Sequence, residues 1–156
     1  MMGGRRRANV PAIHDISTDT VNPPVFVDVL AHRRWALNPP AYAGPAAAAD
    51  QQAAYPDIQP LVVGVPRADV HAAARDIMHA EGWTIVGDAE AEGRLEAVAV
   101  TPWFRFRDDI VVRLTPQDHG RTRVDVRSKS RIGRSDFGMN ARRVRHFLAR
   151  LSDRLA

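Results

Sequence analysis

The sequence contains no cysteine, only one lysine (Lys129) and no long apolar run. Without cysteine the chain cannot form a disulfide, a thiolate metal site or a cysteine nucleophile. No apolar run approaches the roughly 20 residues that a membrane-spanning helix needs, so the chain as written is expected to be soluble. The HExxH, GxSxG, P-loop and GxGxxG motifs are also absent. We therefore predict no metal site, no cofactor and no legible catalytic constellation.

The composition of the 156 residues is that of a globular protein, with 45% hydrophobic and 26% charged residues. A chain of this length typically forms one domain with a single core. The 22 basic residues outnumber 18 acidic ones, which gives a net charge of +4, and all of them except Lys129 are arginines. Arginine binds phosphate and carboxylate through a planar fork, but so small an excess supports nucleic-acid binding only weakly.

The first third of the chain differs in composition from the rest. Residues 1–9 lack a core-forming pattern and carry Arg5–Arg7, so we interpret them as a disordered basic start, or as a juxtamembrane cluster behind a membrane segment outside this chain. Residues 10–57 are rich in proline, which interrupts regular elements, yet they include apolar anchors such as Phe26 and Trp35. We predict that they form an extended arm packed on the domain that follows.

Residues 58–156 alternate between the patterns of strands and helices. Short turns between successive strands favour antiparallel pairing, and two amphipathic helices can cover one face of such a sheet. We predict an α+β fold with a mainly antiparallel sheet, in the order strand, helix, four strands, helix, and with both helices on one face. The expected elements are strands over 58–65, 83–86, 93–101, 109–114 and 121–130, and helices over 67–81 and 136–155.

Alternation along the last predicted strand assigns its side chains to two faces. Val124 and Val126 are expected to face the core. Arg123, Asp125 and Arg127 are expected to face outward.

The densest polar cluster, residues 127–140, leads from the end of that strand into the last helix. Free amides at a helix N-terminus attract anions, and Arg131 and Arg134 can supply guanidinium groups for a phosphate or carboxylate. Ser135 or Asp136 is the expected helix cap. A capping Asp136 would itself occupy the anion position, so the cluster is either a ligand site or a self-satisfied helix start.

A second cluster, residues 101–109, interleaves aromatic residues with arginines. Such a pattern can stack on bases or sugars through Trp103, and it can equally form a hairpin that packs on the arm. Asp108 and Asp109 are adjacent, so on a strand they would face opposite sides and make a poor acid–base pair. The candidate ligand-binding residues of the two clusters are Trp103, Arg131, Arg134, Ser135 and Asp136.

Five stretches of the sequence carry a resemblance to a known family: HDISTDTVNPPVF (14–26), AAYPDIQPL (53–61), EGWTIV (81–86), EGRLEAVAVTPWFRFRDDIVVRL (92–114) and RVDVRSKSRIGRSDFGMNARRVRHFLARL (123–151). Over nearly its whole length from about residue 10, the chain resembles the bacterial domain-of-unknown-function family numbered 1499 (DUF1499). The resemblance implies no agreed activity and offers no catalytic residues to transfer. It implies that members often carry the domain after membrane-spanning segments.

Three functional hypotheses follow from these observations. The first is a non-catalytic ligand-binding or interaction domain at a bacterial membrane or in the envelope, with a small anionic molecule or a protein as partner. The second is a hydrolase-like enzyme that sets Asp15 and Asp19 against the 103–109 turn. The third is a weak nucleic-acid binder, and the acidic residues that alternate with the strand arginines count against it.

Overall fold

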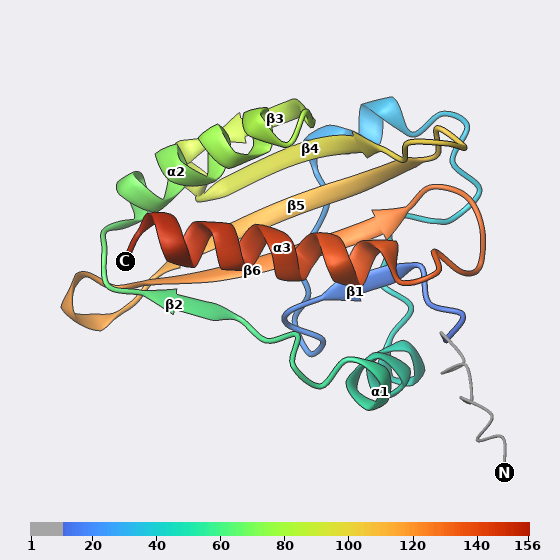
Figure 1. Cartoon of the computed structure of the whole chain (residues 1–156), viewed down its shortest axis with the longest axis horizontal. Coiled ribbons are helices and arrows are strands. Elements are labelled where there is room, and N and C mark those ends of the chain that lie inside the picture. Colours follow the sequence, from blue (N-terminus) through green and yellow to red (C-terminus); the bar gives the residue numbers. More distant parts are fainter. Residues whose placement is uncertain (1–10) are drawn as a thin grey trace, which may run out of the picture.

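The computed structural model of the chain describes residues 11–156 and shows an α+β fold, in which two helices lie across one face of an antiparallel sheet (Figure 1). The predicted basic start, residues 1–9, lies outside the described residues. The helices are α1 (Pro45–Ala54), α2 (Arg67–Ala80) and α3 (Met139–Arg154), with short 3₁₀ turns at Asp28–His32, Glu90–Glu92 and Asp118–Gly120. The strands are β1 (Asp15–Ser17), β2 (Leu61–Val63), β3 (Thr84–Ala89), β4 (Arg94–Val100), β5 (Arg107–Pro116) and β6 (Thr122–Ser130).

The sheet has six strands in the order β1-β6-β5-β4-β3, and β2 also pairs with β6. Strands β3 to β6 form an antiparallel meander, as short turns between them require. Both β1 and β2 pair with the far side of β6, in the registers Asp15↔Lys129 and Leu61↔Val124. The predicted fold class and element order are confirmed, whereas β1 is a strand that the sequence pattern did not reveal.

The main core lies between the sheet and helices α2 and α3. Ile110, Val112 and Val126 on the sheet are fully buried against Val70 of α2 and Val144 of α3. On α3 the largest buried side chain is Phe147, whose ring stacks on Trp83 at 5.7 Å, while Leu148 is only partly buried. Burial of this apolar stripe holds both helices on the same face of the sheet.

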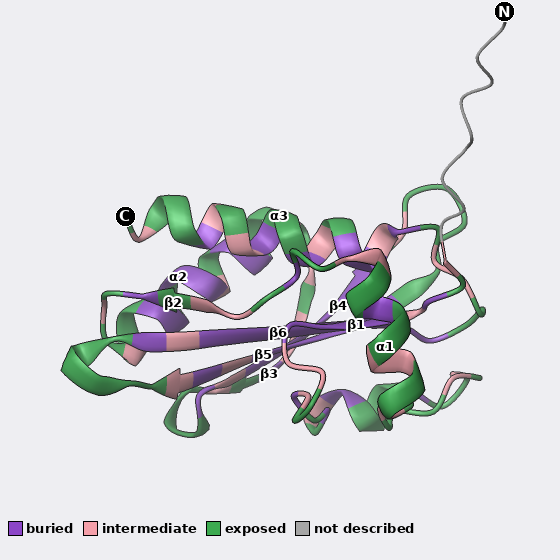
Figure 2. Cartoon of the chain, turned by 90° about the horizontal axis from the view of Figure 1, so that it is seen from below, coloured by how far each residue is buried: buried purple, intermediate pink, exposed green. Residues whose placement is uncertain are grey.

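The opposite face of the sheet is also buried, and it carries charges. Asp125, Arg127 and Lys129 of β6 are almost completely inaccessible. The expectation that Asp125 and Arg127 face solvent is therefore wrong. They point away from the helices, as the alternation predicted, but residues 22–41 lie beneath this face and exclude water (Figure 2).

Apolar side chains and a buried carboxylate bring the segment 22–41 onto the sheet. Phe26 and Val29 pack against Val98 and Val111. Glu96 of β4 accepts hydrogen bonds from the backbone amides of Val27 at 2.8 Å and of Asp28 at 2.6 Å. Gly87 of β3 is required at the closest approach, because a Cβ atom there would collide with the Asp28 side chain. Trp35, expected to be an anchor, is instead 79% exposed.

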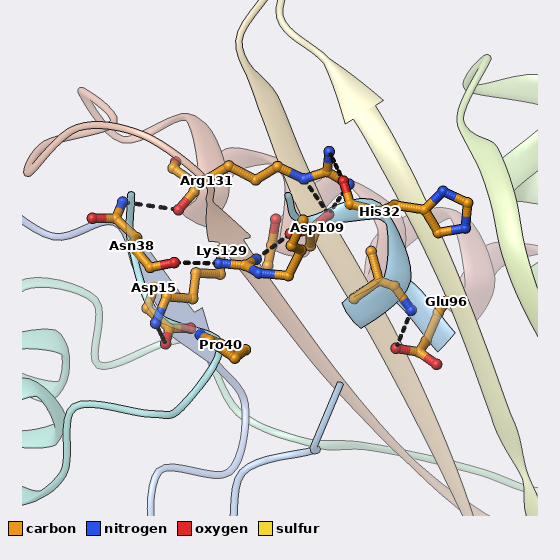
Figure 3. A network of polar contacts seen from close by, with 12 residues as sticks. Asp15, His32, Asn38, Pro40, Glu96, Asp109, Lys129 and Arg131 are labelled. Carbon is orange, nitrogen blue, oxygen red and sulfur yellow. Dashed lines mark hydrogen bonds and ion pairs between the residues drawn. The ribbon is translucent and has the colours of Figure 1, made fainter. Parts of the chain in front are cut away.

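Two groups of buried ions join the segment 22–41 to the sheet (Figure 3). Asp109 of β5 pairs with Arg33 of this segment, and with Arg131 at 2.8 Å. Asp15 of β1 pairs with Arg127 at 2.8 Å and with Lys129 at 3.4 Å. Burial lowers the pKa of Lys129 against the opposing influence of Asp15. Each charge is thus compensated inside the protein rather than by water.

Helix α1 protects the free edge of β1 through a single side chain. The amide of Gln51 donates to the Ser17 carbonyl at 2.7 Å, and its oxygen accepts from the Ser17 amide at 2.9 Å. The side chain therefore satisfies the groups that a neighbouring strand would otherwise pair.

We predict that Asp109→Asn lowers the free energy of unfolding by about 3–5 kcal/mol, because it leaves Arg33 and Arg131 buried without a counter-charge. Urea unfolding at neutral pH measures the change. The control is Asp118→Asn in the exposed turn before β6, which should change stability by less than about 0.5 kcal/mol. Equal effects of the two substitutions would contradict the role assigned to the ion pair.

Candidate functional site

A cleft of about 460 Å³ opens at the end of the sheet where β5 begins and β6 ends. The β4–β5 turn forms one side, and the loop from β6 to α3 forms the other. Its volume lies in the range of small-molecule sites. The lining residues are Thr101, Pro102, Trp103, Phe104, Phe106, Asp108, Ser130, Ile132, Gly133, Ser135, Asp136, Phe137, Met139 and Arg142.

The walls of the cleft are apolar and largely aromatic. Trp103 is 92% exposed and Phe137 is 76% exposed, although both are large apolar side chains. Phe104 and Phe106 stack on each other with ring centroids 5.6 Å apart. Side chains of this size lose apolar contact with water when a ligand covers them, which favours binding of an apolar body.

The floor of the cleft is polar and belongs to a buried network between the sheet and the start of α3. Ser130 accepts a hydrogen bond from Asn140 at 2.9 Å, and Ser128 donates to the same residue at 2.6 Å. Arg143 donates to Asn140 at 2.9 Å, and its guanidinium lies 2.9 Å from the carboxylate of Asp108. The network fixes the floor, because each side chain is held by at least one other.

Asp108 is the buried titratable group of the cleft, with 2% of its surface exposed. Its Oδ2 atom lies 2.9 Å from the Arg143 guanidinium, with which it forms an ion pair. Burial raises the pKa of Asp108, and the nearby Arg143 opposes this shift only in part. The cleft thus has a buried, ion-paired carboxyl group at its floor.

Arg142 supplies positive charge at the rim. Its guanidinium lies 3.0 Å from the Met139 sulfur and 3.5 Å from the Phe137 carbonyl. No carboxylate among residues 11–156 pairs with it. Arg142 is therefore available to an anionic group at the mouth of the cleft.

The predicted site residues do not all meet. Trp103, Ser135 and Asp136 line the cleft. Arg131 is buried on the other face of the sheet, where it pairs with Asp109 and donates to the His32 carbonyl at 2.9 Å. Arg134 is exposed and lies outside the lining. Sequence reasoning missed Asp108, Phe137 and Arg142 as lining residues.

The Asp136 carboxylate accepts hydrogen bonds from backbone amides at the start of α3. The donors are the Gly138 amide at 2.8 Å and the Asn140 amide at 2.7 Å. The helix begins at Met139, later than expected, because Phe137 and Gly138 have positive φ angles of 53° and 83°. The position that a bound anion would take at this helix start is filled by the protein's own carboxylate.

The carboxylates of the hydrolase-like hypothesis are engaged elsewhere. Asp15 is buried with Arg127 and Lys129 on the face of the sheet opposite α2 and α3. Asp19 lies 3.1 Å from Arg123 and 3.4 Å from Arg113. Neither residue lines the cleft beside the 103–106 turn.

The fold and the cleft define an α+β domain whose single antiparallel sheet is covered by helices on one face and by an N-terminal segment on the other. The chain belongs to the family described as "Protein of unknown function (DUF1499)", whose model matches residues 15–151. No curated protein matches it.

Two solved structures are similar to this chain at a low level. A solution NMR structure from Thermobifida fusca has 15% identity and a TM-score of 0.39, over 62% of this chain and 82% of that chain. A crystal structure from Thermus thermophilus has 14% identity and a TM-score of 0.34, over 62% of this chain and 93% of that chain. Likeness at this level carries no argument about function.

We predict that the stabilising effect of Asp108 depends on pH. Because its pKa is higher in the folded than in the unfolded protein, its contribution is fully present below the unfolded value near 3.8 and is lost as pH rises through the raised folded value. Urea unfolding of the wild type and of Asp108→Asn, measured from acidic to neutral pH, should therefore show the wild type losing stability relative to the variant. A relative gain with rising pH would refute the assignment.

We also predict that Asp136→Ala lowers the free energy of unfolding by about 0.5–2 kcal/mol, because two amides at the start of α3 lose their acceptor. Arg134→Ala, two residues earlier, should be nearly silent, since its side chain is exposed. Thermal unfolding of the pair is the measurement. A silent Asp136→Ala would mean that the carboxylate does not cap the helix.

Proposed function

We propose that this protein is a non-catalytic ligand-binding module whose ligand is a small amphipathic molecule. The observation that supports the proposal is the apolar cleft with a buried carboxyl group at its floor and, at its rim, an arginine without a carboxylate partner among the described residues. Pockets that hold small molecules combine apolar walls with a few fixed polar groups in this way.

The charges of the cleft orient the ligand. An apolar or aromatic body fits between Trp103, Phe106 and Phe137. A hydroxyl or amide at its inner end can bond to Asp108, whereas an anionic group would be repelled there and is attracted to Arg142 at the mouth. We therefore propose a ligand with a hydrogen-bonding inner end and an anionic outer end.

We propose that the module works at a bacterial membrane or in the envelope. None of the helices in the described part of the chain is long and apolar enough to cross a membrane. A contact between residues 11–156 and a bilayer is therefore proposed to be a surface contact.

The aromatic sulfonate 1-anilinonaphthalene-8-sulfonate (ANS) tests the proposal, because it joins an apolar body to one negative charge. We predict saturable binding of one ANS per chain, seen as a rise in fluorescence. Phe106→Ser should weaken it by about tenfold or more, since an apolar wall is lost. Arg142→Gln should weaken ANS but not its uncharged relative N-phenyl-1-naphthylamine.

Val62→Ser on β2 is the matched control. Val62 is 49% exposed and Phe106 is 48% exposed. The two side chains are therefore equally accessible, but only Phe106 lines the cleft. The control should bind ANS like the wild type. Unsaturable binding, or equal losses in Phe106→Ser and Val62→Ser, would refute a defined ligand site in the cleft.

A further inference from the structure

Three loops meet at the end of the molecule that carries the cleft. The Leu37 amide donates to the Arg131 carbonyl at 3.0 Å, and the Arg131 amide donates to the Arg107 carbonyl at 3.1 Å. Residues 34–37, 101–107 and 132–137 therefore lie at one end of the sheet, on the right in Figure 1. We refer to these residues, together with Arg142 at the start of α3, as the loop end.

Every strongly exposed aromatic side chain of the described residues belongs to the loop end. Trp103 is the most exposed of them, and Trp35 and Leu37 protrude from the neighbouring loop to the same degree as Phe104. Trp35 and Leu37 lie outside the cleft lining, to which the other exposed aromatic residues belong. Ligand binding in the cleft therefore does not explain why these two residues are apolar. The aromatic members are Trp35, Trp103, Phe104, Phe106 and Phe137.

The positive charges of the loop end lack counter-charges. Most described arginines form ion pairs with carboxylates. Within residues 11–156, the arginines without such a pair are Arg34, Arg67, Arg105, Arg107, Arg121, Arg134 and Arg142. All of these except Arg67 and Arg121 are at the loop end.

The loop end therefore has a nearly uniform sign of charge. Its only acidic residue is Asp136, whose carboxylate is committed to the amides of Gly138 and Asn140. The described chain also starts here, because the Ile13 carbonyl accepts from the Asp136 amide at 3.2 Å.

Protruding aromatic and aliphatic side chains beside unpaired arginines match the chemistry of an anionic bilayer surface. Tryptophan and phenylalanine gain by entering the interfacial region, and each nearby basic residue is attracted to anionic headgroups. A single-stranded nucleic acid would need free aromatic faces. Here Phe104 and Phe106 stack on each other and the Arg34 guanidinium lies over Trp35 at 5.0 Å, which leaves Trp103 and Phe137 as the only exposed rings of the loop end without such a partner.

We infer that the loop end is a docking surface for an anionic lipid bilayer, with Trp35, Leu37 and Trp103 entering the interface and the unpaired arginines binding lipid phosphates. The inference rests on the proposed membrane association but not on ligand binding in the cleft. It also places the mouth of the cleft at the membrane surface.

Sedimentation with vesicles tests the inference directly. The wild type should bind mixed phosphatidylcholine–phosphatidylglycerol vesicles and not pure phosphatidylcholine vesicles. The double variant Arg105→Gln/Arg107→Gln should bind the mixed vesicles roughly twentyfold or more weakly, at about fivefold for each arginine removed. The matched control Arg67→Gln/Arg121→Gln removes the same charge from unpaired arginines elsewhere and should bind nearly as the wild type does.

Insertion is tested separately from charge attraction. Lipids brominated in the upper acyl chain should quench tryptophan fluorescence of the bound wild type, and Trp103→Phe should remove much of this quenching. Trp35→Ser/Leu37→Ser should weaken vesicle binding while leaving ANS binding intact, because neither residue lines the cleft. Circular dichroism confirms that these surface variants fold.

The outcomes separate the alternatives. Failure of the wild type to bind anionic vesicles would refute the inference, and intact ANS binding would leave the ligand-binding proposal standing. Equal losses in the two double-arginine variants would mean attraction by net charge rather than docking. Nanomolar binding to an oligonucleotide that depends on Trp35 or Trp103 would assign the surface to nucleic acid instead.

Discussion

The burial of charged side chains on β6 is the constraint on which the rest of the structure depends. Arg127 and Lys129 point away from the main core and would be solvated if the sheet had only one covered face. The segment 22–41 covers them instead, so water must be replaced by protein partners. Asp15 and the carbonyls of Pro24, Pro40 and Ala41 provide these partners. A covering segment without such acceptors would leave charges buried at a cost of several kcal/mol.

This constraint explains why the covering segment has little regular structure. Arg127 and Lys129 need backbone carbonyls, and a helix or strand would use those carbonyls internally. Proline removes amides without removing carbonyls, so a proline-rich chain offers acceptors that have no competing local donors. Phe26 and Tyr42 add a second interaction, because the Arg127 guanidinium lies 4.5 Å and 5.6 Å from their ring centres. The proline-rich composition of residues 22–41 thus suits the positively charged side chains that they cover.

The fold of residues 58–156 was predictable because its signals are local. Two-residue alternation in β5 and β6 and the apolar stripe of α3 identify the elements, and short turns fix their pairing. Strand β1 was not predictable in this way, because three residues carry no period and Asp15 and Ser17 are polar. Their assignment depends on Lys129 and Gln51, which are far away in sequence. The burial of Asp125 and Arg127 was not predictable for the same reason. Alternation shows which face of the sheet a side chain is on, but it does not show which distant segment covers that face.

In the candidate site, too, residues in local sequence patterns were predictable, and residues placed by tertiary contacts were not. Trp103, Ser135 and Asp136 were found because aromatic and helix-start patterns are local. Asp108 was missed although its face was predicted. Alternation separates it from Asp109, but only the tertiary structure shows that Asp108 meets the start of α3 while Asp109 meets Arg33. Arg131 was misleading because its neighbours in sequence line the cleft, whereas its own side chain points to the opposite face.

Hydrogen bonds link the wall of the cleft to the segment 22–41 on the other face of the sheet. Asn38 donates to the carbonyls of Ser130 and Gly133 at 2.9 Å each, and Leu37 bonds to Arg131. The loop that forms one wall of the cleft is therefore held from behind by residues 37 and 38, which Arg33 and Asp109 anchor in turn. The Gly133 φ of 93° lets this loop turn between the two faces. The covering segment thus does more than exclude water: it positions the cleft wall and presents Trp35 and Leu37 beside the cleft mouth.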